Sequence, residues 1–176
     1  MANKKLLIIG IDGAEFRVVR RLIECNMLAN MRMLSEAGSW GVLRSTTPPV
    51  TAVAWLSLAS GMNPGSHGVY GFVTVDRAVG EIKLSKPSKS SVPKLWDMLA
   101  NARWRVGVFN FPSYFPPDPI QPFFISGFGS PNRAELAFPS SVWSILGNSY
   151  RIQPSVRAKD DPLGFLKEVR QITKQQ

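Results

Sequence analysis

Residues 4–13 read KKLLIIGIDG, a short apolar run that ends in an acid and a glycine. Continuous apolar runs of this length are typical of strands that are covered on both faces, as in the interior of a parallel α/β sheet. Ligands bind such sheets beyond the carboxyl ends of the strands, which is where Asp12 would stand. Asp-Gly is also a common turn pair, so a simple turn role for Asp12 is the alternative. The run predicts a buried strand over residues 5–11.

Residues 45–55, STTPPVTAVAW, place two prolines ahead of a hydroxyl that opens a helical run. The prolines stop any upstream helix, because they fix φ and disfavour α geometry at the preceding residue. Thr51 is then the expected N-cap of a helix over residues 52–60. The first N–H groups of that helix would favour an anion. Thr51 is therefore either a helix cap or a nucleophile held beside an anion site.

Along the rest of the chain, expected strands and helices alternate. Helices are expected over residues 16–24, 28–37, 52–60, 91–102, 140–146 and 161–174, and strands over residues 5–11, 40–44, 105–111 and 123–127. This alternation predicts an α/β fold with a mostly parallel sheet flanked by helices. We expect a single α/β domain over residues 1–176, in which residues 132–176 form a helical extension.

Three segments together resemble the type I phosphodiesterase and nucleotide pyrophosphatase family of the alkaline phosphatase superfamily. They are residues 9–13 (IGIDG), residues 46–55 and residues 61–68 (GMNPGSHG). The resemblance continues in order to about residue 131, and an ordered series of motifs is more specific than any one of them. It implies an alkaline-phosphatase-like fold and a metal-dependent hydrolase of phosphate esters, either small molecules or nucleotides.

The resemblance also implies roles for individual residues. In this family, the acid after the first strand binds one of two catalytic metal ions, commonly zinc, and that acid matches Asp12. The attacking hydroxyl matches Thr51, which would also bind metal, and the backbone N–H of Ala52 is a candidate donor to the substrate phosphate. Two divalent ions, zinc or manganese, would lower the pKa of a bound hydroxyl and neutralise phosphoryl oxygens.

Most of the family's metal ligands have no counterpart in this sequence. The family completes its two-metal site with further Asp and His residues, whereas this chain has one histidine, His67, at a turn position. The other aspartates lie in expected loops or on solvated helix surfaces: Asp76, Asp97, Asp118, Asp160 and Asp161. We therefore expect the N-terminal part of such an enzyme, incomplete and inactive alone. The alternative is a catalytically dead remnant that serves as a binding or assembly module.

An incomplete sheet would leave an unpaired strand edge, through which the chain would self-associate. The chain has 21 basic and 12 acidic residues and a net charge of +9, which raises nucleic-acid binding as a second alternative. The densest basic stretch holds Lys83, Lys86, Lys89 and Lys94 and lacks interleaved aromatic residues, which argues against single-stranded nucleic acid. These lysines either form a solvated loop with no further role or steer an anionic ester toward Thr51.

The sequence also bears on location. The apolar run over residues 6–11 is shorter than a signal-peptide core and meets Asp12 at once, so neither a secretion signal nor a membrane span is expected. The single cysteine, Cys25, cannot form an intramolecular disulfide, which fits a reducing compartment. These features predict a cytoplasmic protein.

Overall fold

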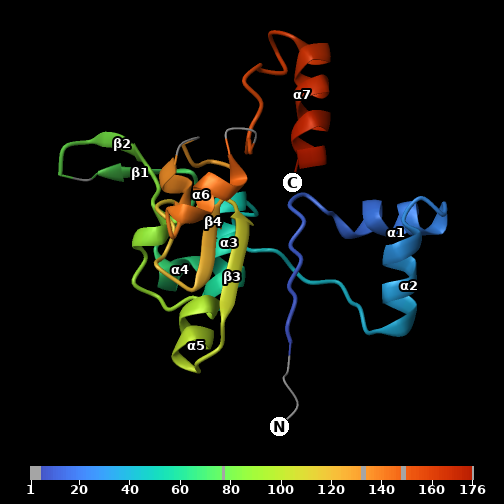
Figure 1. Cartoon of the computed structure of the whole chain (residues 1–176), viewed down its shortest axis with the longest axis horizontal. Helices are drawn as coiled ribbons and strands as arrows, with labels where there is room; N and C mark the ends of the chain where they lie inside the picture. The colour runs from blue at the N-terminus through green and yellow to red at the C-terminus, as the bar shows by residue number, and fades with distance from the viewer. Residues whose placement is uncertain (1–4, 77, 132–133, 148–149, 176) are drawn as a thin grey trace. The chain divides into compact units, whose positions relative to one another are not determined.

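The computed structural model describes residues 5–76, 78–131, 134–147 and 150–175 (Figure 1). The chain divides into two units, residues 1–44 and residues 45–176, and each is described by itself. Among the described residues, no helix has both the length and the apolar character needed to cross a bilayer.

The first unit contains two short helices, α1 (Phe16–Glu24) and α2 (Ala29–Ala37). Both lie where the sequence predicts them. The N-cap of α1 is Glu15, whose carboxylate accepts a hydrogen bond from the backbone N–H of Val18 at 3.3 Å. The guanidinium of Arg32 in α2 donates to the backbone carbonyl of Ile23 in α1, which fastens the two helices together.

The strands expected over residues 5–11 and 40–44 do not form. Within the described part of the chain, neither segment joins a sheet, and their large apolar side chains are exposed. Leu7, for example, is 80% exposed and Leu43 is 87% exposed. A strand needs a neighbour that accepts and donates its backbone hydrogen bonds, and an apolar run does not specify that neighbour. The prediction of a buried strand at residues 5–11 is therefore wrong for this structure.

In the described part of the second unit, the strands form two small sheets. Strands β1 (Val73–Asp76) and β2 (Glu81–Leu84) form an antiparallel hairpin. Strands β3 (Val106–Phe111), β4 (Pro122–Ser126) and β5 (Ala137–Phe138) form the other sheet in that order. β3 and β4 are parallel, whereas β4 and β5 are antiparallel. The mixed α/β class is confirmed, but the expected mostly parallel sheet is wrong, partly because a short turn can join β1 to β2 only as antiparallel neighbours.

Among its described residues, this unit also has the helices α3 (Thr51–Ser60), α4 (Pro64–His67), α5 (Leu95–Asn101), α6 (Ser141–Leu146) and α7 (Pro162–Gln175). Two 3-10 turns, η1 (Pro87–Lys89) and η2 (Ala134–Leu136), lie between them along the chain. α3, α6 and α7 closely match the expected ranges. α5 is shorter than the expected range 91–102, because the Asp97 carboxylate accepts the N–H of Lys94 at 2.8 Å and fixes the helix start at Leu95.

The main core of the second unit is built around Trp96 of α5. The Trp96 ring packs edge-on against Phe111, Tyr114 and Phe124, with centroid distances of 5.1–5.2 Å. Its indole N–H donates to Asp118 Oδ2 at 2.7 Å, and the Tyr114 hydroxyl donates to the same oxygen at 2.5 Å. Burial, together with the Asp118 carboxylate, raises the pKa of Tyr114, so its hydroxyl keeps the proton that it donates. Asp118 is thus a half-buried acceptor and not the solvated loop residue that was expected.

Replacing Asp118 by alanine is expected to destabilise the second unit by about 2–4 kcal/mol, because two buried donors would lose a charged acceptor. Urea unfolding followed by far-UV circular dichroism measures the change. Asp160→Ala, which removes an exposed carboxylate paired with Arg157, is the control and should leave the midpoint unchanged. An Asp118→Ala midpoint equal to that of the wild type would show that Asp118 does not fasten this loop.

The carboxylate of Glu168 in α7 holds the segment that precedes the helix. It accepts hydrogen bonds from the Ser155 N–H at 2.6 Å and the Ser155 hydroxyl at 2.7 Å, and it pairs with Arg151 at 3.1 Å. These hydrogen bonds to Ser155, followed by smaller contributions that include the charge of Arg151, lower the pKa of Glu168.

A lowered pKa gives this carboxylate a pH-dependent effect on stability. Its contribution is present above the unfolded pKa, near 4.5, and is lost as the pH falls through the lower folded value. The melting temperature should therefore fall less steeply below pH 4.5 in Glu168→Gln than in the wild type. Thermal unfolding at a series of pH values measures this slope, and equal slopes for the two proteins would contradict it.

Candidate functional site

Thr51 is the first residue of α3 and not its cap. The N-cap position belongs to Val50, which is extended (φ −111°, ψ 140°), and no side chain caps the helix. The expectation that Thr51 is the N-cap is therefore wrong by one residue. Because valine has no hydrogen-bonding side chain, the start of α3 keeps its positive end open to an anion.

Hydrogen bonds on both sides of Thr51 hold the backbone in place. Thr46 Oγ1 donates to the Pro48 carbonyl at 2.8 Å, and the Val50 carbonyl accepts from the N–H groups of Val53 and Ala54 at 3.0 and 2.8 Å. Within the described residues, the N–H of Ala52 has no hydrogen-bond partner. The Ala52 side chain itself is buried. This arrangement presents one fixed backbone donor directly beside the Thr51 side chain.

Asp12 lies in a turn of the first unit. Gly13 follows it with φ +69°, a left-handed conformation that favours glycine, so the pair forms the turn that was the alternative interpretation. The Asp12 side chain is exposed. Asp12 and Thr51 belong to different units, so the structure does not define the distance between them. Only Thr51 and Ala52 of the three predicted site residues are placed together.

A side-chain hydrogen bond of His67 links α4 to α3. Its Nδ1 accepts the N–H of Val69 at 3.2 Å, and its Nε2 lies 2.9 Å from the Ser57 hydroxyl oxygen. Burial lowers the pKa of His67 and favours the neutral ring. We therefore assign the proton to Nε2, which donates to Ser57. Both ring nitrogens are engaged, so His67 is not available as a metal ligand or as a base in this arrangement.

The described residues do not form a metal centre by themselves. None of their His, Cys, Asp and Glu side chains gather in groups of three or more that could hold an ion. Zinc usually takes three or four protein ligands. The donor set that the structure places together therefore does not fit the two-metal site of the resemblance.

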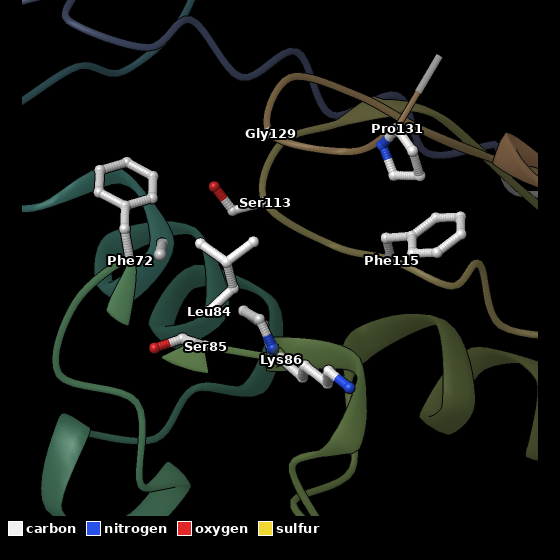
Figure 2. A pocket seen from close by; sticks show the side chains of 10 residues that line it. Phe72, Leu84, Ser85, Lys86, Ser113, Phe115, Gly129 and Pro131 are labelled. Atoms are coloured by element: carbon white, nitrogen blue, oxygen red, sulfur yellow. The ribbon is translucent and has the colours of Figure 1, made fainter. Parts of the chain in front are cut away.

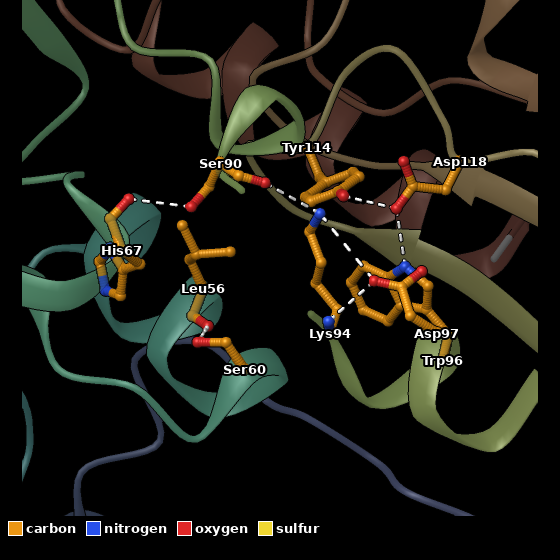
Figure 3. Close-up of polar contacts among 9 residues, drawn as sticks. All are labelled: Leu56, Ser60, His67, Ser90, Lys94, Trp96, Asp97, Tyr114 and Asp118. Atoms are coloured by element: carbon orange, nitrogen blue, oxygen red, sulfur yellow. Dashed lines mark hydrogen bonds and ion pairs between the residues drawn. The ribbon is translucent and has the colours of Figure 1, made fainter. Parts of the chain in front are cut away.

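The lysines expected in a solvated loop differ in their surroundings. Lys94 is only 8% exposed, and its Nζ donates to the Ser90 carbonyl at 3.2 Å (Figure 3). The Ser90 hydroxyl in turn donates to the His67 carbonyl at 2.9 Å. Lys83 pairs with Asp76 at 2.7 Å. The expected solvated loop is therefore wrong for Lys94, whose side chain is part of a buried network.

A pocket of about 160 Å³ lies beside the start of α3 (Figure 2). Its apolar lining comes from Ala52, Phe72, Leu84, Pro87, Phe115 and Pro131, and its remaining lining from Ser85, Lys86, Ser113 and Gly129. Of these, Ala52 was predicted to be a site residue, and Lys86 was predicted only to be part of a basic loop. Ser113 follows the expected strand over residues 105–111, and the carboxyl end of a strand in an α/β sheet was the signal that could have identified it.

The comparisons with known proteins give one match. A family model described as type I phosphodiesterase / nucleotide pyrophosphatase matches residues 6–159. Neither the curated proteins nor the solved structures contain a match to the chain. The matched range includes Asp12, Thr51, Ala52 and every residue that lines the pocket.

Proposed function

Since this chain belongs to the type I phosphodiesterase / nucleotide pyrophosphatase family, we propose that it supplies the nucleophile of a metal-dependent phosphate-ester hydrolase, and that Thr51 is this nucleophile. Membership of this family supports a phosphodiesterase- or pyrophosphatase-type hydrolase activity on phosphate esters or nucleotides. The observation that carries the proposal is the uncapped start of α3, where Thr51 is the first residue and the N–H of Ala52 has no partner among the described residues.

In this proposal, Thr51 Oγ forms a bond to phosphorus while the bond from phosphorus to the ester oxygen breaks. The Ala52 N–H and the positive end of α3 stabilise the charge that develops on the phosphoryl oxygens. The Thr51 proton must pass to a base. His67 does not serve, because it accepts from Val69 at Nδ1 and donates to Ser57 at Nε2. His67 is therefore excluded as the activating group in this arrangement.

Enzymes of this family are generally metal-dependent. We assign Asp12 and Thr51 as this chain's contribution to a site for two divalent ions, zinc or manganese. The described residues hold no group of three or more candidate ligands, so they do not complete this site. We propose instead that the remaining ligands come from outside this chain and that the chain alone is inactive. Hydrolysis of an aryl phosphodiester by a polypeptide that joins this chain to those ligands, with and without Thr51→Ala, tests the assignment.

One observation favours the second candidate function, a binding or assembly module. The apolar side chains of residues 6–9 and 11 are exposed, as are those of Trp40, Val42 and Leu43. Large exposed apolar patches are unusual on monomeric proteins and commonly mark interaction sites. We infer that these two segments mediate self-association of the isolated chain.

The isolated chain is expected to sediment as a dimer or larger species at micromolar concentration, because association would cover these apolar segments. The double variant Leu7→Lys with Leu43→Lys should shift the population toward monomer. Val79→Lys, at an apolar residue that is 62% exposed in the β1–β2 turn of the second unit, is the control. Sedimentation velocity distinguishes the species, and a wild-type chain that stays monomeric at every concentration would refute the inference.

A further inference from the structure

We propose that the pocket beside α3 binds the organic group of the phosphate ester, and that this group is a single aryl ring or an apolar group of that size. The inference rests on the proposed function, because it assigns the substrate of that same site. It is carried by the volume of the pocket, its apolar lining and one unpartnered hydroxyl, that of Ser113.

The pocket is partly open, and its volume matches a group the size of one ring. An apolar cavity of about 150 Å³ is large enough to bind benzene, and this pocket measures about 160 Å³. A nucleoside joins a ribose to its base and exceeds that volume. The rings of Phe72 and Phe115 and the side chain of Leu84 belong to the lining, which suits an apolar group (Figure 2). A single aryl ring therefore fills the pocket, whereas part of a nucleotide would lie outside it.

Ser113 supplies the polar group that faces the ester. Its Oγ is buried and has no hydrogen-bond partner among the described residues. Figure 2 shows this hydroxyl pointing toward the side of the pocket where Phe72 lies. A buried hydroxyl without a partner is destabilising. Among the four such hydroxyls of the described residues, Ser113 is the one that lines the pocket, where a ligand oxygen would accept its hydrogen bond. A phosphoryl oxygen at the pocket wall formed by Ala52 is such an acceptor.

The fold holds Ser113 rigidly in this position. Ser113 has φ +56°, an uncommon conformation for a residue other than glycine, and its N–H donates to the Phe128 carbonyl at 2.6 Å. A Cβ on Gly129 would lie only 3.3 Å from Ser113 Oγ, so glycine allows the close approach of the two loops. These loops follow β3 and β4, whose carboxyl ends share one edge of the parallel pair. Strained residues cluster at functional sites, which fits a binding role for Ser113.

The charge of the lining also suits an anionic ester. Lys86 is exposed and lines the pocket, whereas the residues that form the pocket include no Asp or Glu. A positive side chain at the pocket, together with the positive end of α3, attracts a phosphate ester and not a cationic ligand.

Titration of the whole chain with small probes, followed by amide chemical shifts and without added metal, tests the proposal. The probes are phenyl phosphate, inorganic phosphate, phenol and adenosine monophosphate. Phenyl phosphate should bind about tenfold more tightly than each of the other three, because it alone combines one ring with a phosphate. The amides of Ala52, Ser113 and Gly129 should shift. Binding of phenyl phosphate that is no tighter than binding of inorganic phosphate, or of adenosine monophosphate, would overturn the proposal.

Two pairs of variants separate the polar and apolar parts of the pocket. Ser113→Ala should weaken phenyl phosphate and inorganic phosphate by about tenfold without lowering the melting temperature, because it removes an unpaired buried hydroxyl. Ser126→Ala, which removes another unpaired buried hydroxyl away from the pocket lining, is the matched control. Leu84→Asn should weaken phenyl phosphate alone, whereas Ile82→Asn in the same strand should not. Wild-type affinity of Ser113→Ala for both phosphate probes would refute the role of Ser113.

These titrations involve no turnover, so they fail independently of the hydrolase proposal. If phenyl phosphate binds as described but the completed polypeptide hydrolyses no ester, the pocket assignment stands and the proposed function fails. If hydrolysis depends on Thr51 but phenyl phosphate shows no preference over inorganic phosphate, the pocket assignment fails and the proposed function stands.

Discussion

Thr51→Ala is expected to lower the turnover of an aryl phosphodiester by about three orders of magnitude or more, in a polypeptide that joins this chain to the family's remaining metal ligands. The reason is that the substitution removes the atom that forms the covalent bond to phosphorus, and its loss leaves only binding and electrostatic effects. Release of 4-nitrophenolate from bis(4-nitrophenyl) phosphate, read as kcat and KM, measures the change.

The matched controls use the same helix. Thr51→Ala should keep α3 folded, because no side chain caps this helix, and far-UV circular dichroism checks the fold. Thr51→Ser keeps a hydroxyl and should retain measurable turnover. Ser57→Ala removes the hydroxyl beside His67 without touching the start of α3, and it should change kcat far less than Thr51→Ala. A Thr51→Ala protein that works at close to the wild-type rate would exclude Thr51 as the nucleophile.

The chain by itself is expected to hydrolyse the same ester no faster than free metal ions do, at any zinc or manganese concentration. Two-metal catalysis requires two ions about 4 Å apart, each held by several ligands. Asp12 and Thr51 cannot supply that set, and no cluster of three or more candidate ligands occurs among the described residues.

This second expectation is checked by two measurements on one sample. Metal content after gel filtration reports whether ions stay bound, and 4-nitrophenolate release reports turnover. We expect less than one equivalent of metal and no saturable rate. A purified monomer with metal-dependent, saturable turnover would show instead that segments assigned here to loops provide the missing ligands.

Much of the helical structure was predictable, because helix starts and ends are encoded locally. The range of α1 and the start of α3 after Pro48 and Pro49 follow from residues within one or two turns of each helix. The sheets were not predictable in the same way. The run over residues 5–11 has the composition of a buried strand, but a strand also depends on a distant segment to pair with it. The β1–β2 hairpin was missed because its apolar residues are exposed and form no buried run.

The candidate site, too, could be predicted only where its residues are neighbours in the sequence. Thr51 and Ala52 could be identified because they are neighbours in one motif. The pocket could not, because Phe72, Leu84, Ser113 and Gly129 meet only through the packing of the hairpin and the loops after β3 and β4. Local pattern also says nothing of partners, which is why Lys94 and Asp118 were expected in solvent and lie instead in hydrogen-bonded networks.

The central claim is that the Thr51 oxygen attacks phosphorus, and mass spectrometry tests it most directly. The completed polypeptide is mixed with an aryl phosphodiester, quenched in acid during turnover and digested, and the peptide that contains Thr51 is sequenced in the mass spectrometer. We expect a phosphoester mass on Thr51 that is absent from Thr51→Ala. Turnover with the adduct on another residue, such as Ser57 or His67, or with no adduct on Thr51, would contradict it.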